Sequence, residues 1–401
     1  MNYRFSETID SFKSSAVREI LKLTQGRSII SLAGGLPNEQ YFPLDAVRDA
    51  FARVFEQGNS VLQYGLTEGF TPLRESISKH LARKGIHAGI DNMLLTTGSQ
   101  QAIDLLTKIY VDPGDVILVE KPTYLAAIQV FQSHKARLVS VDCDTDGMNP
   151  EDLERKIKLH QPKFVYVIPT FANPTGKAWS IERRQHTLDI CKRNNVLILE
   201  DDPYGELRFG KGEPLPSIFS LGGEADGNPV IYTSTFSKIV APALRTGWVV
   251  GDKEVIRHMA RAKQAADLHS STMDQQAIHQ IFESFDIYGH IDLIRTQYEI
   301  RMHQMIDLLK AQNWEGVKWV EPKGGMFIWV EMPQHIDTAE LMKFAVEEGV
   351  AFVPGVSFYA DEPQTNSMRL NFTHTDYEEM KTAFERLNRA IEKLQSVAVQ
   401  P

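Results

Sequence analysis

The chain has 401 residues, 42% apolar and 24% charged, a composition typical of a globular protein large enough for one large and one smaller core. Its net charge of −9 and the lack of a Lys/Arg block argue against a nucleic-acid partner, because phosphate binding needs a basic face. Cys143 and Cys191 lie outside metal-binding spacings, so we predict buried, reduced thiols and no metal. No apolar run could span a membrane and no signal peptide is present, which favours a cytoplasmic protein without membrane contact.

The N-terminal segment contains a short helical pattern and a glycine turn. Apolar residues recur at helical spacing over residues 16–23, which predicts a short amphipathic helix that carries Arg18. Farther on, Ala33-Gly34-Gly35-Leu36-Pro37 predicts a turn where Gly35 lets the backbone approach a ligand closely. An exposed helix face and an ordinary turn would give the same two patterns. The loop of residues 63–69 contains Tyr64, and apolar positions 73, 77 and 81 predict the helix that follows it.

Apolar strands alternate with helices between residues 93 and 200. The strands are predicted at residues 93–97, 116–119, 137–141, 164–168 and 196–199, and the helices begin near residues 101, 125, 150 and 180. Near-continuous apolar strands in such an alternation predict a mostly parallel sheet with helices on both faces, and therefore an α/β fold. Ligands in such sheets bind at the carboxyl ends of the strands.

The connection after the first of these strands is only Gly98-Ser99-Gln100. The free amide groups at the start of the following helix and the Ser99 hydroxyl predict an anion site. A strand–turn–helix without a ligand would look the same.

Polar residues follow three other strands of the predicted sheet. Tyr124 is suited either to stacking on a flat heterocycle or to filling a gap in the core. Asn173 heads an Asn-Pro-Thr-Gly turn and would ordinarily close that turn. Glu200-Asp201-Asp202-Pro203-Tyr204 ends a buried strand, where carboxylates commonly cap a helix or face solvent.

Hydroxyls, one lysine and one arginine are concentrated in residues 233–248. We predict a buried strand over residues 230–232, a return strand over 247–251, and a connection that holds Thr235, Ser237, Lys238 and Arg245. Desolvation and a neighbouring cation would lower the proton affinity of the Lys238 amine, as attack on a carbonyl requires. Considered singly, Lys238 and Arg245 would be assigned to the solvated surface.

The last third of the chain begins with helices predicted at residues 255–261, 272–282 and 287–312. The long third helix is expected to bridge two domains. Short strands at residues 317–320, 325–330 and 367–372 then predict a separate small α/β layer. Arg369 lies in an apolar strand and needs an anionic partner, either a structural carboxylate or the carboxylate of a substrate.

These segments together resemble the pyridoxal-phosphate enzymes of the aspartate aminotransferase fold, and most closely the 2-aminoadipate, kynurenine and broad-specificity aminotransferases. The resemblance covers essentially the full length. The family's Ser/Thr-x-Ser-Lys segment usually begins with serine, whereas in this chain it begins with Thr235, which keeps the hydroxyl. The residues on which the resemblance rests occur in the same order as in the family. They are Asn173, Asp201, Tyr204, Lys238, Arg245 and Arg369.

The resemblance implies a role for each of these residues. Lys238 would hold pyridoxal 5'-phosphate as the Schiff-base lysine and then carry the reaction's proton, and Asp201 would pair with the ring nitrogen. Arg369 would grip the substrate α-carboxylate, and Arg18 would meet an acidic substrate side chain. Further cofactor contacts are expected from Ser99, Gln100, Tyr124, Asn173, Tyr204, Thr235, Ser237 and Arg245, and further substrate contacts from Asn173 and Gly35. The Asn173–Pro174 bond is expected to be cis.

The implied reaction moves an amino group from an L-amino acid (2-aminoadipate, aromatic, branched-chain or glutamate) to a 2-oxo acid such as 2-oxoglutarate, in two half-reactions. In the family, the tyrosine matching Tyr64 binds the cofactor phosphate of a second subunit, so a homodimer is expected. We expect an arm at residues 1–45, a large cofactor-binding domain at 46–285 and a small domain at 286–401. A β-lyase or decarboxylase on the same fold, or an effector-binding sensor, remains the alternative.

Overall fold

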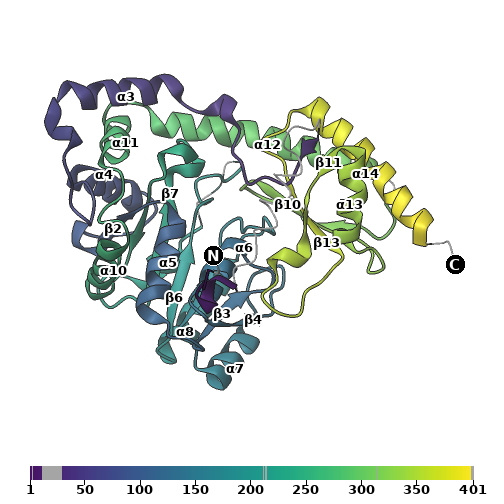
Figure 1. The fold of residues 1–401 in the computed structure, drawn as a ribbon, viewed down its shortest axis with the longest axis horizontal. Helices are drawn as coiled ribbons and strands as arrows, with labels where there is room; N and C mark the ends of the chain where they lie inside the picture. Colours follow the sequence, from purple (N-terminus) through teal and green to yellow (C-terminus); the bar gives the residue numbers. More distant parts are fainter. Residues whose placement is uncertain (2, 11–28, 211, 213–214, 313, 399–401) are drawn as a thin grey trace.

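The fold consists of two α/β units that lie side by side (Figure 1). The computed structural model describes residues 1–401 except residues 2, 11–28, 211, 213–214, 313 and 399–401. One unit is built on a seven-stranded sheet and the other on a four-stranded sheet. None of the helices in these described ranges is both long and apolar enough to cross a membrane.

The seven-stranded sheet is mostly parallel, as the sequence predicts. Its only antiparallel strand is β8, which pairs with β2 on one side and β7 on the other. The strands in spatial order are β2 (Met93–Thr96), β8 (Gly247–Val250), β7 (Val230–Thr235), β6 (Leu197–Asp201), β5 (Phe164–Val167), β3 (Val116–Glu120) and β4 (Arg137–Val141). β6 and β7 extend farther than predicted, so Asp201 and Thr235 are the last residues of their strands.

Helices cover both faces of this sheet. Those packed on one face are α5 (Ser99–Tyr110), α6 (Leu125–Ser133) and α10 (Lys253–Ala266). Those on the other face are α4 (Thr71–Ala82), α7 (Pro150–His160), α8 (Ile181–Arg193), α9 (Ile218–Gly222) and α11 (Thr272–Ser284). α11 in turn packs against α3 (Leu44–Glu56).

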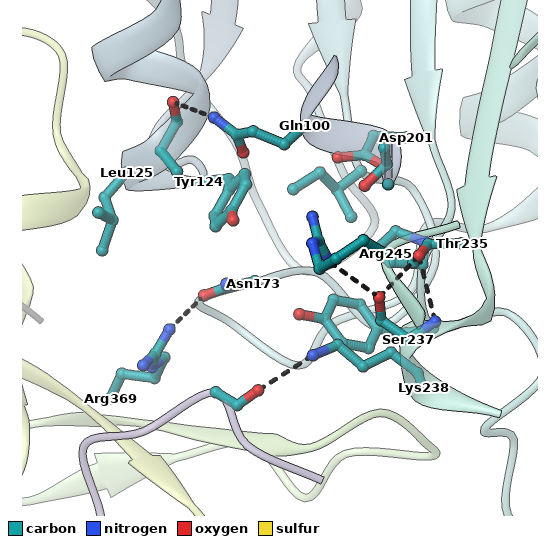
Figure 2. A pocket seen from close by; sticks show the side chains of 17 residues that line it. Gln100, Tyr124, Leu125, Asn173, Asp201, Thr235, Ser237, Lys238, Arg245 and Arg369 are labelled. Carbon is teal, nitrogen blue, oxygen red and sulfur yellow. Dashed lines mark hydrogen bonds between the residues drawn. The ribbon is translucent and has the colours of Figure 1, made fainter. Parts of the chain in front are cut away.

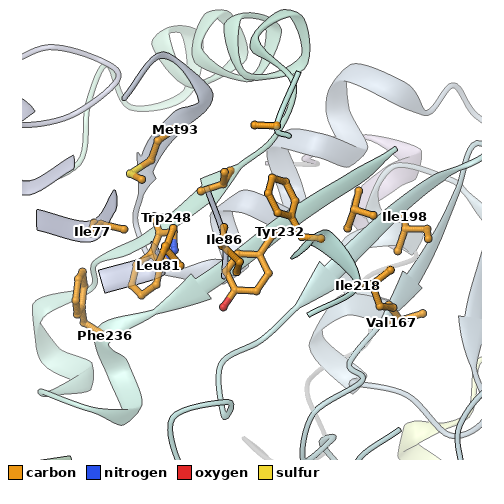
Figure 3. Close-up of a cluster of buried hydrophobic side chains, with 14 of the residues drawn as sticks. Ile77, Leu81, Ile86, Met93, Val167, Ile198, Ile218, Tyr232, Phe236 and Trp248 are labelled. Atoms are coloured by element: carbon orange, nitrogen blue, oxygen red, sulfur yellow. The ribbon is translucent and has the colours of Figure 1, made fainter. Parts of the chain in front are cut away.

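The strand side chains alternate between these two layers, as the pleat requires. Leu94 and Tyr166 point into the layer with α5, whereas Leu95 and Val167 point into the layer with α4. Figure 3 shows part of the second layer, where Trp248 and Phe236 lie 4.8 Å apart between their ring centroids. The sheet is therefore buried on both faces, which leaves its strand ends as the place for a ligand.

The second unit contains an antiparallel sheet with its own hydrophobic core. Its strands in spatial order are β12 (Val353–Pro354), β13 (Ser367–Asn371), β10 (Phe327–Glu331) and β9 (Lys318–Trp319). α13 (Thr338–Glu348) and α14 (Tyr377–Ala398) pack against each other beside it. The strand predicted from Gly325 begins two residues later, because the φ angle of Gly325 is 78°, outside the strand region.

Two segments connect the units. α12 (Ile287–Ala311) places Ile287 and Ile291 in the core of the large unit and its later apolar residues in the core of the small one. Near the N-terminus, after α1 (Glu7–Asp10), β1 (Ile30–Ser31) pairs in parallel with β11 (Val350–Ala351) of the small unit. The predicted helix at residues 16–23, with Arg18, lies outside the described residues, and the proposed domain boundaries stay predictions.

Candidate active site

A cavity of about 280 Å³ lies at the carboxyl ends of the large sheet's strands, with Arg369 of the small unit and Gly35 of the N-terminal segment also in its lining (Figure 2). It brings together twelve of the predicted site residues, which come from segments far apart in the chain. These are Gly35, Ser99, Gln100, Tyr124, Asn173, Asp201, Tyr204, Thr235, Ser237, Lys238, Arg245 and Arg369.

Lys238 ends a short 3₁₀ helix, η4 (Phe236–Lys238), directly after β7. Its Nζ donates a hydrogen bond of 3.0 Å to the carbonyl oxygen of Gly35. Burial, and then the positive charges of Arg369 and Arg245, lower the pKa of Lys238 to about 8. The neutral form of the amine, which attacks a carbonyl carbon, is therefore far more populated near neutral pH than in an ordinary lysine.

A ring of donors at one end of the cavity fits a phosphate dianion. Gly98, with φ of 75°, precedes α5, and no side chain caps the amide groups that begin this helix. Opposite, Arg245 Nη1 donates to Ser237 Oγ over 3.4 Å, and the Ser237 and Thr235 hydroxyls are 2.9 Å apart. Helix amides, hydroxyls and a guanidinium group together form a strong anion site.

Gly98 is required for this arrangement. A Cβ atom there would lie 2.6 Å from Nη2 of Arg245, which instead donates to the Thr97 carbonyl oxygen at 3.2 Å. Any larger residue would displace the guanidinium group from the end of the helix.

Asp201 presents one free carboxylate oxygen to the cavity. Its Oδ2 accepts a 2.8 Å hydrogen bond from the hydroxyl of Tyr166, whereas its buried Oδ1 has no partner. Burial raises the pKa of Asp201 to about 7, the Tyr166 hydrogen bond opposes that rise, and Asp202 adds to it. A buried acceptor without a donor is unfavourable by itself, so this oxygen fits a ligand that carries a proton on nitrogen.

Arg369 is buried and faces the same cavity from β13. Its Nη1 donates to Asn173 Oδ1 at 2.8 Å and its Nη2 to the Ala33 carbonyl oxygen at 2.5 Å, while Nε is buried without a partner. Its guanidinium carbon lies 4.2 Å from the centroid of the Phe327 ring. No ion pair joins Arg369 to any described carboxylate, so the structural partner considered from the sequence is not found there.

Tyr124 and Tyr204 complete the cavity. Tyr124 directly precedes α6, and burial raises its pKa to about 12, so its phenol stays neutral. Tyr204 is buried, with its ring edge-on to Phe327 at 5.9 Å. The Asn173–Pro174 bond is cis, as the resemblance predicted.

Tyr64 is not part of this cavity. Its side chain is 78% exposed, and its ring lies edge-on to that of His269 at 5.8 Å. Within this one chain the structure therefore separates Tyr64 from the phosphate-sized donor ring.

Some lining residues were not predicted from the sequence. Leu125, Ala126, Ile168 and Pro203 line the cavity as apolar or backbone surface, for which composition gives no signal. Tyr166 was also missed, because a tyrosine in an apolar strand is most simply interpreted as core. Only the position of its hydroxyl shows that it contacts Asp201.

Comparison with known proteins identifies the family. Residues 28–387 match the model of aminotransferase class I and II, and the chain belongs to this family. It is 40% identical to the aromatic-amino-acid aminotransferase 1 of Thermococcus litoralis, over 97% of this chain and 94% of that protein.

Two crystal structures are closely similar. Kynurenine aminotransferase of Pyrococcus horikoshii, in complex with PMP, superposes with a TM-score of 0.91 at 42% identity and 97% coverage of both chains. The α-aminoadipate aminotransferase LysN of Thermus thermophilus, complexed with N-(5'-phosphopyridoxyl)-L-leucine, gives 0.90 at 34% identity and 98% coverage of both. The protein is accordingly a pyridoxal-phosphate-dependent aminotransferase.

The residues of the cavity fit this cofactor. The donor ring matches a phosphate group, and the free Oδ1 of Asp201 matches a protonated ring nitrogen. Lys238 supplies the amine that the cofactor's aldehyde requires.

Proposed function

We propose that this aminotransferase moves the amino group of an L-amino acid to a 2-oxo acid such as 2-oxoglutarate in two half-reactions. The observation that carries this proposal is Arg369, buried and without a described carboxylate partner beside Lys238. A planar guanidinium group in that state is suited to bind the carboxylate shared by amino acids and 2-oxo acids. The Arg369 guanidinium group would then bind the carboxylate of the amino acid and of the 2-oxo acid in turn.

The residues around the cofactor are proposed to act as follows. When bound, pyridoxal phosphate would withdraw electrons from the substrate and so make the proton on its α-carbon more acidic. Ser99, Gln100, Thr235, Ser237 and Arg245 hold its phosphate. Asp201 Oδ1 keeps the ring nitrogen protonated.

Three further residues orient the reactants. Tyr124 packs on the ring of the cofactor, while Asn173 and Tyr204 bind its 3-oxygen. Lys238 Nζ would carry the proton between the substrate α-carbon and the cofactor's carbonyl carbon. A substrate contact is also proposed for Gly35, whose carbonyl oxygen accepts a hydrogen bond from Lys238.

The donors that we propose are 2-aminoadipate, aromatic and branched-chain amino acids and glutamate. The names and ligands of the relatives described above support aromatic donors, kynurenine, aminoadipate and leucine. The cations in the described lining are Lys238, Arg245 and Arg369, and each already has a proposed role. An acidic substrate side chain therefore needs a further cation, and Arg18 remains the prediction for it.

An absorbance experiment tests this function. The purified protein, loaded with pyridoxal phosphate, is scanned before and after addition of single L-amino acids. Transamination converts the visible band to the shorter-wavelength band of the pyridoxamine form, and 2-oxoglutarate restores it. If no amino acid shifts the band, the proposed donors are wrong.

We propose that the active unit is a homodimer in which Tyr64 contacts the phosphate of the partner subunit. Leu62, Tyr64 and Leu66 are exposed apolar residues in one short segment, a cluster typical of a subunit interface.

The cytoplasmic location also stays a prediction.

Mixed dimers test the role of Tyr64. A Lys238→Ala chain and a Tyr64→Ala chain are each impaired, yet their hybrid has one complete site only if Tyr64 acts across the interface. Recovery of activity and of tight cofactor binding after subunit exchange is expected. A hybrid no more active than the two parents would place Tyr64 outside the partner's site.

A further inference from the structure

Tyr166 is a buried polar residue that the reaction, as described so far, does not use. It lies in the middle of β5 and is fully buried, with its ring 5.4 Å from that of Phe131 and edge-on to it. Opposite it on the neighbouring strand β6 is Leu199, two residues before Asp201. The ring would pack equally well as phenylalanine, so the hydroxyl needs a separate explanation.

The hydroxyl of Tyr166 has one effect that depends on its position. It donates to Oδ2 of Asp201 at 2.8 Å, and this bond leaves Oδ1 as the only oxygen free to face the cavity. A carboxylate held by one oxygen cannot rotate freely, because rotation would break a buried hydrogen bond. The tyrosine therefore fixes the direction in which Asp201 accepts.

The charge of Asp201 depends on the same bond. The titratable groups around Asp201 are Tyr166 on β5, Tyr124 at the start of α6, and Asp202 and Tyr204 on its own segment. No described lysine or arginine forms an ion pair with Asp201. Burial and Asp202 raise the pKa of Asp201, and the Tyr166 hydrogen bond lowers it.

We propose that Tyr166 is a positioning residue that aims Asp201 Oδ1 at the ring nitrogen of the cofactor and keeps this carboxyl group ionised. This inference rests on the proposed role of Asp201. Without the Tyr166 hydroxyl, the proton shared between the carboxyl group and the ring nitrogen moves toward the carboxyl oxygen. The ring then withdraws electrons less strongly from the substrate.

The test compares Tyr166→Phe with Tyr298→Phe. Tyr298 is a matched control, because it is also buried and its hydroxyl accepts a 3.0 Å hydrogen bond from the Asn38 amide, far from Asp201 in the chain. Each variant is loaded with ¹⁵N-labelled pyridoxal phosphate, and the ring-nitrogen chemical shift is followed against pH by NMR.

In Tyr166→Phe the ring nitrogen is expected to lose its proton at a lower pH than in the wild type. We expect kcat about 10-fold lower, with KM for the amino acid nearly unchanged because Arg369 is intact. Tyr298→Phe should titrate like the wild type. Tyr166→His, whose ring N–H can donate to the same oxygen, should recover the wild-type titration and keeps the test informative if the phenylalanine variant does not fold.

The Asp201→Asn variant separates the proposed role of Tyr166 from the proposed role of Asp201. If Asp201→Asn deprotonates the ring nitrogen but Tyr166→Phe titrates like the wild type, the inference about Tyr166 is wrong and the role of Asp201 stands. If Asp201→Asn also leaves the titration unchanged, the role of Asp201 itself is wrong. An equal shift in Tyr166→Phe and Tyr298→Phe would likewise overturn the inference, since it would reflect a general loss of packing.

Discussion

Two cavities of similar volume lie beside each other in this protein, and they differ in how their charged groups are paired. The second cavity, about 250 Å³, is lined by Glu120 and Lys121 from the end of β3 and by Trp329 of β10. Like the first cavity, it therefore takes residues from the strand ends of the large sheet and from the small unit.

Two charged groups of the second cavity, Glu120 and Lys121, already have partners. Glu120 Oε1 accepts from Trp179 Nε1 at 3.0 Å and Oε2 from the Ile168 amide at 2.7 Å. Lys121 forms an ion pair of 2.7 Å with Glu362. In the first cavity, and among the described residues, the Lys238 amine hydrogen-bonds only to a carbonyl oxygen, and Asp201 keeps one oxygen free. Unpaired buried charge, rather than volume, distinguishes the site that is built for a ligand.

The lysines of the two cavities provide the sharpest test of this difference. Lys238→Ala is expected to abolish the visible absorbance of the lysine-bound cofactor and to lower kcat by about 10⁴-fold, since one amine is both anchor and proton carrier. Lys121→Ala should keep the band and change the free energy of unfolding by only about 1 kcal/mol. Absorbance scans and urea unfolding measure both. A Lys238→Ala protein that retains the band would refute the assignment.

Substitutions of the two buried carboxylates, Asp201 and Glu120, are expected to change different properties, namely the rate of the reaction and the stability of the fold. Asp201→Asn should lower kcat by about 10²- to 10³-fold, because it removes preorganised negative charge at the ring nitrogen. Glu120→Gln turns one acceptor oxygen into a donor that faces an N–H group, so it should lower the free energy of unfolding by about 1–3 kcal/mol while kcat stays unchanged. Steady-state kinetics with denaturant unfolding separates these results. A large loss of kcat in Glu120→Gln would mean that the second cavity takes part in the reaction.

The pH dependence of the two lysines should show the smallest effect. Burial and two arginines lower the pKa of Lys238 to about 8, whereas the Glu362 hydrogen bond raises the pKa of Lys121. An amine reacts only when neutral, so acetic anhydride should modify Lys238 of the cofactor-free enzyme with a rate that is half-maximal near pH 8 and reaches its plateau at higher pH. Lys121 should react appreciably only at higher pH. Peptide mass spectrometry measures both, and equal profiles would contradict the contrast.

The sequence predicts the large sheet well, because each strand is a continuous apolar run followed by a helical pattern. It does not predict β1 and β11, which are two residues long and pair across more than 300 positions, and so carry no periodicity. α3 was also missed, although Val47, Ala50 and Val54 follow helical spacing. The cavity lining was predicted where a side chain carries reaction chemistry, as at Lys238 and Arg369.

Residues that act through another residue could not be predicted in the same way. Tyr166 contacts Asp201 because β5 and β6 pair in a particular register, and that register is a tertiary property. Likewise, the sequence does not reveal that Arg369 contacts Asn173 and Ala33, since three distant segments must meet for those bonds to form. The type of a residue indicates the chemistry it can perform, whereas its hydrogen-bond partners are known only from the folded structure.

The order of the site residues along the chain also determines when the site can form during synthesis. All of the proposed phosphate contacts within the chain and Lys238 precede residue 250, so the ribosome completes them while the last 150 residues are still unmade. Arg369 emerges last of these groups, on a strand flanked on both sides by others of its sheet. The residues proposed to hold the cofactor are thus translated well before the arginine proposed to bind the substrate carboxylate.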